Sequence, residues 1–90
     1  MDYKKESEVL KALGHPIRLR MVEGLLENEC NVTKITDILN IPQSTTAQHL
    51  GILKSRGIIG ARKEGVKTCY KVIDKRVKRI VSALNESKQK

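Results

Sequence analysis

The sequence predicts a mainly α-helical domain that carries one small β-hairpin, in the order of four helices, two strands and a final helix. Apolar residues recur at helical spacing along most of the chain, and glycine, proline or asparagine residues separate the resulting segments. One stretch, residues 58–72, is instead rich in β-branched residues around a central glycine, which favours a hairpin. A length of 90 residues provides a single modest core, so we expect one domain over residues 1–90.

The first two helices are predicted on either side of Gly14. The first covers residues 4–13, and its apolar residues recur at helical spacing: Val9, Leu10 and Leu13. The second begins with Pro16, which is tolerated in a first helical turn, and carries a broad apolar stripe to about residue 28. Because Arg18 interrupts this stripe, we expect its guanidinium to bind a carboxylate or the carbonyls of a helix end, with a phosphate contact as the alternative.

Residues 31–56 predict two short helices joined by a tight corner. Asn31 can cap the first of these helices, and Asn40 ends it. Pro42 disfavours helical backbone at the residue before it, so the chain turns there and a new helix starts. This new helix opens with polar, hydrogen-bonding residues: Gln43, Ser44, Thr45 and Thr46.

The helix after Pro42 has an apolar side and a polar side. At about 100° per residue, the apolar side holds Thr46, Ala47, Leu50 and Leu53. The polar side holds Ser44, Thr45, Gln48, His49, Ser55 and Arg56. Ile52 also falls on the polar side, and this division gives no account of it. A polar helix flank followed by a basic hairpin is typical of a helix that lies against DNA.

A hairpin and a last helix complete the chain. Ile58–Ile59 and residues 68–72 predict two strands around a loop at residues 63–67, with Gly65 near its tip. The tip is basic, because it carries Arg62, Lys63 and Lys67. Asp74 can cap the last helix, in which a narrow apolar ridge repeats at helical spacing: Val77, Ile80, Val81 and Leu84. Such a ridge suits contact with a partner helix.

Positive charge is concentrated in the second half of the chain. The sequence has 18 Lys and Arg residues against 10 Asp and Glu, a net charge of +8. Through Leu53 there are 6 basic and 7 acidic residues, and from Lys54 onward there are 12 and 3. This asymmetry favours a polyanionic partner over a merely soluble basic surface. With no Trp or Phe and only 2 Tyr, the chain lacks stacking platforms for single strands, so duplex DNA is the expected target.

Other function classes find little support. No stretch approaches the roughly 18 apolar residues of a membrane span, and the first residues lack the apolar core of a signal peptide, so we expect a cytoplasmic protein. No nucleophile, base and orienting group can be assembled, so an enzyme is not expected. Cys30 and Cys69 lack CxxC spacing, which predicts neither a disulfide framework nor a zinc ribbon.

Two separated motifs resemble one family. Leu10–Leu19, LKALGHPIRL, is similar to the opening signature of the ArsR/SmtB family of bacterial and archaeal repressors. Residues 43–50, with Leu53 and Gly57–Ile59, are similar to that family's recognition helix and its exit into the wing. The chain therefore resembles a winged helix-turn-helix repressor from about Val9 to Leu84. The resemblance implies a homodimer that binds an imperfect palindrome in double-stranded DNA and leaves it when an inducer arrives.

The polar helix side and the wing supply the residues expected at DNA. Gln48 can pair with adenine through two hydrogen bonds, and His49 can donate to a purine N7 or a phosphate. The expected DNA-binding set is Gln43, Ser44, Thr45, Gln48, His49, Lys54, Arg56, Arg62, Lys63 and Lys67. The resemblance implies pairing through the first and last helices, and the expected interface residues are Val9, Leu10, Leu13, Val77, Ile80, Val81 and Leu84.

The metal sites common in this family are not matched, so no metal or cofactor is expected. Asn31 and Thr33 hold the places of the paired cysteines at the start of the third helix, and Cys30 is one position early. On the last helix Asp74 matches, but Arg76, Ser87 and Lys90 stand at the other ligand positions. Relatives that sense oxidants use other cysteines, one of which Glu23 replaces here.

The sequence leaves alternatives for the two cysteines and for the function class of the domain, and it predicts a role for His15. Cys30 and Cys69 can form a new redox-active dithiol pair in a thiol-responsive repressor, or they can simply pack as half-buried side chains. The domain can also be a protein-interaction module, because winged helices serve as docking domains as well. We expect His15 to be a helix-end residue rather than a ligand.

Overall fold

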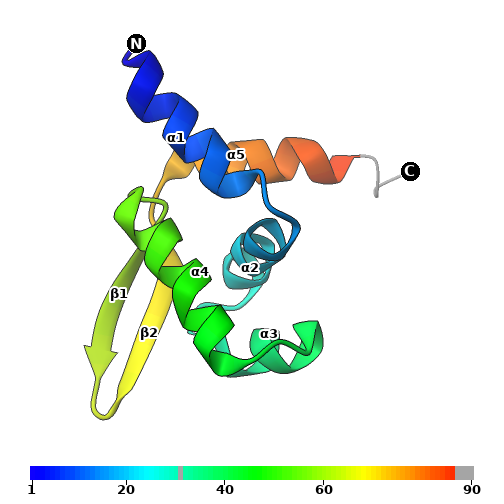
Figure 1. The fold of residues 1–90 in the computed structure, drawn as a ribbon, viewed down its shortest axis with the longest axis vertical. Coiled ribbons are helices and arrows are strands. Elements are labelled where there is room, and N and C mark those ends of the chain that lie inside the picture. Colours follow the sequence, from blue (N-terminus) through cyan, green and yellow to red (C-terminus); the bar gives the residue numbers. More distant parts are fainter. Residues whose placement is uncertain (31, 87–90) are drawn as a thin grey trace.

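The helices and strands follow the predicted order. The computed structural model describes residues 1–30 and 32–86, so the predicted cap Asn31 lies outside the described residues. The elements are α1 (Tyr3–Leu13), α2 (Pro16–Glu27), α3 (Val32–Leu39), α4 (Gln43–Ser55), β1 (Ile59–Glu64), β2 (Lys67–Val72) and α5 (Lys75–Leu84). In Figure 1, α1 and α5 lie together at one end of the molecule, and α3, α4 and the hairpin lie at the other. None of the helices in the described part of the chain has the length and apolar character that a membrane crossing requires.

Local capping signals explain where several helices begin. The Asp74 carboxylate accepts hydrogen bonds from the backbone N–H groups of Arg76 (2.8 Å) and Val77 (3.4 Å), which confirms the predicted cap of α5. His15 Nδ1 accepts from the N–H of Ile17 at 3.2 Å, so His15 is a helix-end residue, as expected. Asn40 ends α3 with a left-handed φ of 53°, a conformation that asparagine tolerates better than most residues.

The core forms around α2, which every other helix approaches through at least one buried side chain. Met21, Val22 and Leu25 of α2 are at most 1% exposed. They pack in one cluster with Leu50 and Leu53 of α4, Ile58 and Ile59 at the base of the hairpin, and Val77 and Val81 of α5. Each such side chain contributes about 1.5–3 kcal/mol when it is fully buried. This cluster therefore fixes α4 and the hairpin on a common base.

The hairpin is longer and its loop tighter than the sequence indicated. The strands are antiparallel, with Ile59 opposite Val72 and Glu64 opposite Lys67, which leaves a loop of only Gly65 and Val66. Gly65 has a φ of 66°, which a two-residue hairpin loop requires and glycine adopts without strain. The predicted strand residue Ile58 instead precedes β1 and is completely buried. The hairpin thus projects from a buried base to an exposed tip.

Four residues that the sequence assigned to a dimer interface belong to the core of the single chain. Val9, Leu13, Val77 and Val81 are at most 7% exposed. The prediction was wrong for them because α1 and α5 use these positions to cover their own domain. Leu10 and Leu84 are 57% and 59% exposed, and Ile80 is half-buried. An apolar strip narrower than predicted therefore remains on the outside.

Candidate nucleic-acid interface

The polar side of α4 faces outward. Gln43, Ser44 and Gln48 are exposed, and Thr45 is half-buried. On the opposite side, Thr46 is 2% exposed, and its hydroxyl lies 3.1 Å from the Thr36 hydroxyl of α3. This pair satisfies both hydroxyls and fixes α4 against α3. The helix is therefore rotated as predicted, except that Ala47, placed on the inner side from the sequence, is exposed.

His49 is held differently from its neighbours on the polar side. Its ring is half-buried, with its centroid 4.8 Å from that of His15, and its Nδ1 lies 3.4 Å from an Arg18 guanidinium nitrogen. Burial lowers the pKa of His49, and the nearby His15 and Arg18 lower it further. Because guanidinium can only donate, Nδ1 is the acceptor, and the ring proton belongs on Nε2. His49 thus carries one N–H donor, and its predicted contact with DNA stays a prediction.

Arg18 connects the end of α1 with α4. Its Nε donates to the Ala12 carbonyl at 2.6 Å, and a second guanidinium nitrogen lies 3.5 Å from the Lys11 carbonyl. This confirms the expectation that the guanidinium binds helix-end carbonyls. Since its third contact is with His49, Arg18 links the N-terminal helix to the polar side of α4.

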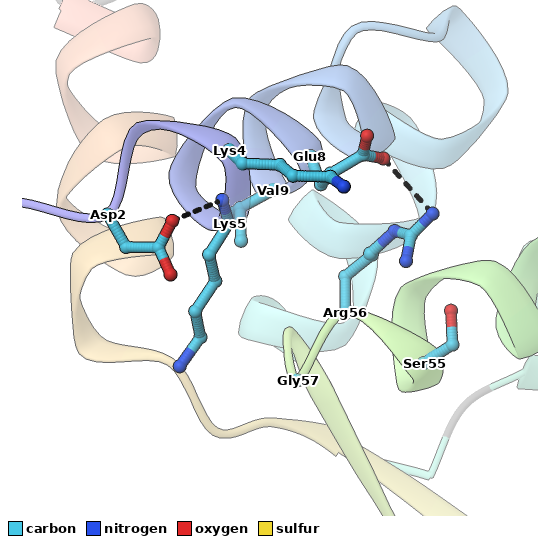
Figure 2. Close-up of a pocket in the computed structure, with 8 residues that line it drawn as sticks. All are labelled: Asp2, Lys4, Lys5, Glu8, Val9, Ser55, Arg56 and Gly57. Carbon is cyan, nitrogen blue, oxygen red and sulfur yellow. Dashed lines mark hydrogen bonds and ion pairs between the residues drawn. The ribbon is translucent and has the colours of Figure 1, made fainter.

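Two cations expected at phosphate groups form ion pairs within the chain. Arg56 lies 3.1 Å from Glu8 of α1, and Arg62 lies 2.8 Å from Glu64 on the same strand. Figure 2 shows the Glu8–Arg56 pair across a hollow of about 480 Å³ between α1 and the end of α4. The i, i+2 spacing of Arg62 and Glu64 could have revealed their pairing, whereas the Glu8 contact depends on the tertiary fold.

The other expected cations stand clear of such pairs. Lys54, Lys63 and Lys67 are exposed, and none forms an ion pair within residues 1–30 and 32–86. Glu64 and Lys67 flank the hairpin loop, and Lys63 lies one residue further along β1. The loop residue Val66, which the sequence analysis did not single out, is fully exposed. The tip therefore presents an apolar side chain between two lysines. In a groove of a nucleic acid, such a tip offers contacts to both phosphates and sugars.

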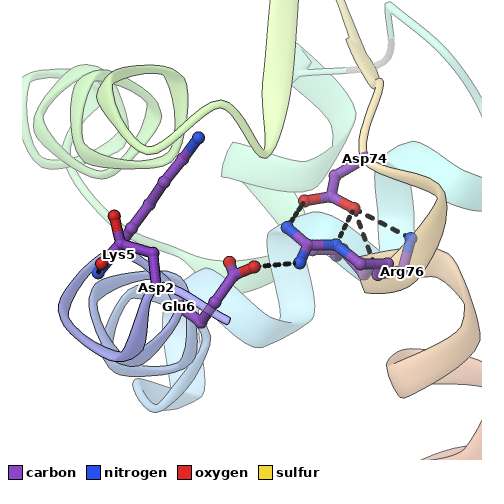
Figure 3. A network of polar contacts seen from close by, with 6 residues as sticks. Asp2, Lys5, Glu6, Asp74 and Arg76 are labelled. Carbon is purple, nitrogen blue, oxygen red and sulfur yellow. Dashed lines mark hydrogen bonds and ion pairs between the residues drawn. The ribbon is translucent and has the colours of Figure 1, made fainter.

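Polar contacts at the other end of the molecule join α1 to α5. Figure 3 shows Arg76 between Glu6 and Asp74, with ion pairs to both carboxylates. The hydrogen bond from Arg76 is the main cause of the lowered pKa of Glu6. Burial acts to raise the pKa of Asp74, but hydrogen bonds from the Arg76 side chain and from two backbone N–H groups outweigh it and lower the pKa. No local sequence signal marks Glu6 as a member of this network.

The structure pairs the two cysteines. Cys30, in the turn after α2, forms a disulfide with Cys69 of β2, and their Cα atoms are 4.3 Å apart. The cysteine spacing did not indicate this bond, and the alternative that the two cysteines approach one another is confirmed. Glu64 is close by, because its carboxylate and the two sulfurs lie within 4.8 Å of one another. With both sulfurs in the bond, this trio offers no thiolate to a metal ion.

Comparison with known proteins places the chain in a family. Residues 15–60 match the model of the bacterial regulatory proteins of the arsR family. The chain is 46% identical over 85 residues to an uncharacterised HTH-type transcriptional regulator, MJ1325 of Methanocaldococcus jannaschii, covering 93% of this chain and 96% of that protein. It is 37% identical over 87 residues to the transcriptional repressor PagR of Bacillus anthracis, covering 94% of this chain and 86% of PagR.

The fold leads to the same family. The solution structure of a homodimeric winged helix-turn-helix DNA-binding domain, Mb0332 of Mycobacterium bovis, superposes with a TM-score of 0.84. The alignment covers 97% of this chain and 81% of that domain at 26% identity. With the matching family model, the whole-length relatives and the shared fold, the chain belongs to the ArsR family of winged helix-turn-helix transcriptional regulators.

Proposed function

We propose that this protein is a homodimeric repressor that binds double-stranded DNA through the polar side of α4 and the tip of the hairpin. The observation that carries the proposal is the exposed row Gln43, Ser44 and Gln48 on a helix whose other side is fixed in the core. A recognition helix needs this combination of a rigid base and free hydrogen-bonding side chains. The relative PagR is named a transcriptional repressor, which supports the same direction of regulation.

A few side chains of α4 recognise the base sequence of the DNA. Gln48 pairs with an adenine edge in the major groove through its amide, and Ser44 and Thr45 contact bases or phosphates. His49 contributes the N–H donor at Nε2, which suits a purine N7 or a phosphate oxygen. Neighbouring lysines hold the helix in register on the duplex: Lys54, Lys63 and Lys67.

Dimerisation occurs through α1 and α5. Leu10, Ile80 and Leu84 form the apolar strip left uncovered by the single chain, and Tyr3 is 79% exposed on the same helix as Leu10. A second copy would cover this strip, and the homodimeric state of Mb0332 supports that arrangement. Twofold symmetry then places two α4 helices in successive major grooves, about 10 base pairs apart, on an imperfect palindrome. Occupancy of such a site blocks transcription.

A second candidate function is a repressor whose DNA binding responds to thiol chemistry. The Cys30–Cys69 disulfide favours it, because both cysteines are bonded within the domain that would bind DNA. The two functions are compatible, since the second adds regulation to the first. Metal binding and catalysis form no part of the proposal, and the expected compartment is the cytoplasm.

Fluorescence anisotropy on a duplex from the region upstream of the gene tests the main proposal. We expect tight binding that weakens steeply as the salt concentration rises, because lysine contacts to phosphates release counterions. Sedimentation velocity on the same samples should show two chains per duplex. A strictly monomeric protein with no duplex affinity at low ionic strength would overturn the proposal. Salt-insensitive binding to a protein partner alone would indicate the interaction-module alternative.

A further inference from the structure

The disulfide ties together two parts of the proposed DNA-binding surface. Cys30 stands immediately before α3, and Cys69 lies in β2, the second strand of the hairpin. The chain between them contains α3, α4 and β1, so the bond closes a loop around the whole helix-turn-helix. The backbone N–H of Cys30 also donates to the Tyr70 carbonyl at 3.0 Å. The hairpin is therefore fastened to the entrance of the helix-turn-helix by one covalent bond and one hydrogen bond.

The two cysteine residues differ in their exposure to solvent. Cys30 is exposed in its turn, whereas Cys69 is only 5% exposed. Cys30 also has a φ of 67°, in the left-handed region that residues other than glycine seldom adopt. A dissolved reagent can thus approach Cys30 more readily than Cys69. This division is the one expected for an attacking thiol and a resolving thiol.

The charges around the pair favour an anionic reagent. Lys67 and Lys71 are exposed and lie two residues on either side of Cys69, on the same face of β2. Arg62 stands opposite Cys69 in the strand register. The Glu64 carboxylate near the sulfurs is neutralised by its ion pair with Arg62. Lys67 and Lys71 therefore leave the β2 side of the disulfide positively charged, which attracts small anions, while Glu29 places a negative charge beside Cys30.

We propose that Cys30 is a modification site for small anionic disulfides of the glutathione-disulfide class, that Cys69 resolves the adduct, and that the resulting bond strengthens DNA binding. In the reduced protein, the Cys30 thiolate attacks one sulfur of the small disulfide and releases one small thiolate. The Cys69 thiolate then attacks the Cys30 sulfur and releases the second. Two electrons pass from the protein to the small disulfide, and the two protons end on the two released thiols.

The expected effect on DNA binding rests on the proposed function. In the oxidised protein the hairpin and α3 are held in one arrangement. Less conformational entropy is therefore lost when both contact a duplex. In the reduced protein the base of the hairpin stays packed in the core, but the junction with Cys30 keeps only the Cys30–Tyr70 backbone hydrogen bond. We therefore expect the oxidised form to bind the upstream duplex several-fold more tightly than the reduced form.

Trapping the intermediate tests the chemistry. The protein is reduced with dithiothreitol, desalted into buffer with a chelator, and exposed to oxidised glutathione. In wild type quenched early with iodoacetamide, peptide mass spectrometry should place the first adduct on Cys30, and later samples should contain the Cys30–Cys69 disulfide. Cys69→Ser should accumulate a stable adduct at Cys30, whereas Cys30→Ser, its matched control, should stay largely unmodified. Equal reaction at both cysteines, or thiols that persist in wild type, would overturn the assignment.

Anisotropy with the upstream duplex tests the coupling. The doubly substituted Cys30→Ser/Cys69→Ser protein, checked for helicity by circular dichroism, should bind like reduced wild type under both redox conditions. If oxidised and reduced wild type bind equally well, the regulatory inference fails while the proposed function stands. If no form binds any duplex, the proposed function itself fails, and the exchange chemistry is judged by mass spectrometry alone.

Discussion

The two ends of this molecule are held together in opposite ways. At the end formed by α1 and α5, buried valines and leucines provide the packing, and an exposed Arg76 network joins the two helices. At the end formed by α3, α4 and the hairpin, the outer surface is polar and a disulfide fastens the parts. The first end can recruit a second copy by covering apolar surface. At the second, a covalent bond supplements the buried packing of Leu50, Leu53 and Ile58 beneath a polar outer surface.

Removing the disulfide gives the largest expected effect and tests this contrast directly. A bond between cysteines 39 residues apart restricts the unfolded chain and stabilises the fold by about 4 kcal/mol. Cys30→Ser/Cys69→Ser should lower the free energy of unfolding by that amount in urea titrations followed by circular dichroism. Oxidised wild type is the reference, and dithiothreitol should destabilise it while leaving the variant unchanged. Equal midpoints for all samples would mean that packing alone holds the hairpin end.

Truncating a buried residue of α5 gives the next largest effect. Val77 is completely buried, and Val77→Ala should destabilise the fold by about 2 kcal/mol through lost burial and the cavity left behind. Leu84→Ala on the same helix is the matched comparison, because Leu84 is 59% exposed. It should leave the stability of the monomer nearly unchanged and raise the dissociation constant of the dimer in sedimentation equilibrium. The reverse pattern would restore the original assignment of Val77 to the interface.

The residues at these two ends were predictable from the sequence to different degrees. The corner at Pro42, the cap at Asp74 and the outward side of α4 follow from local rules, which act within about one helical turn. The Cys30–Cys69 bond and the Glu8–Arg56 pair join residues far apart in the chain, so no local spacing predicts them. The apolar ridge of α5 was ambiguous for another reason. A helix presents the same residue types to its own core and to a partner, and only the packing shows which valines are already covered.

At the DNA end, Gln48→Ala should weaken binding to the upstream duplex by roughly 1–3 kcal/mol. The loss arises because the side chain reads a base edge, so binding to unrelated duplexes should change little. Competition anisotropy with specific and unrelated DNA measures both. Ser82→Ala, exposed on α5 at the other end of the molecule, is the control and should leave both affinities unchanged. Unchanged specific affinity in Gln48→Ala would mean that α4 lies in the groove with another side inward.

Lys63→Ala should have a smaller and less selective effect. Lys63 is exposed at the hairpin tip, so its loss should weaken binding to specific and unrelated duplexes alike. The slope of log affinity against log salt concentration should fall in magnitude by about 1. Lys78→Ala is the matched control, because Lys78 is an exposed lysine on α5, away from the hairpin. It should leave the affinity and the salt slope nearly unchanged. If Lys63→Ala changes only the specific duplex, the tip reads bases and the division between α4 and the hairpin is wrong.

The smallest expected effect is the loss of stability at low pH that arises from the ion pairs between α1 and α5. The pKa values of Glu6 and Asp74 are lowered from ordinary values of 4.5 and 3.8, so their contacts with Arg76 stabilise the fold above those values. This stability is lost as the pH falls through the lowered pKa values, because the protonated carboxyls no longer attract the guanidinium. The contribution is small, since the Arg76 side chain that both carboxylates bind is more than half exposed. Thermal unfolding of Arg76→Gln between pH 3 and pH 7 should show a weaker pH dependence than wild type, whereas Arg79→Gln, exposed on the same helix, should keep it. An identical pH dependence in wild type and Arg76→Gln would show that the buried residues alone join α1 to α5. The polar network would then contribute no measurable stability.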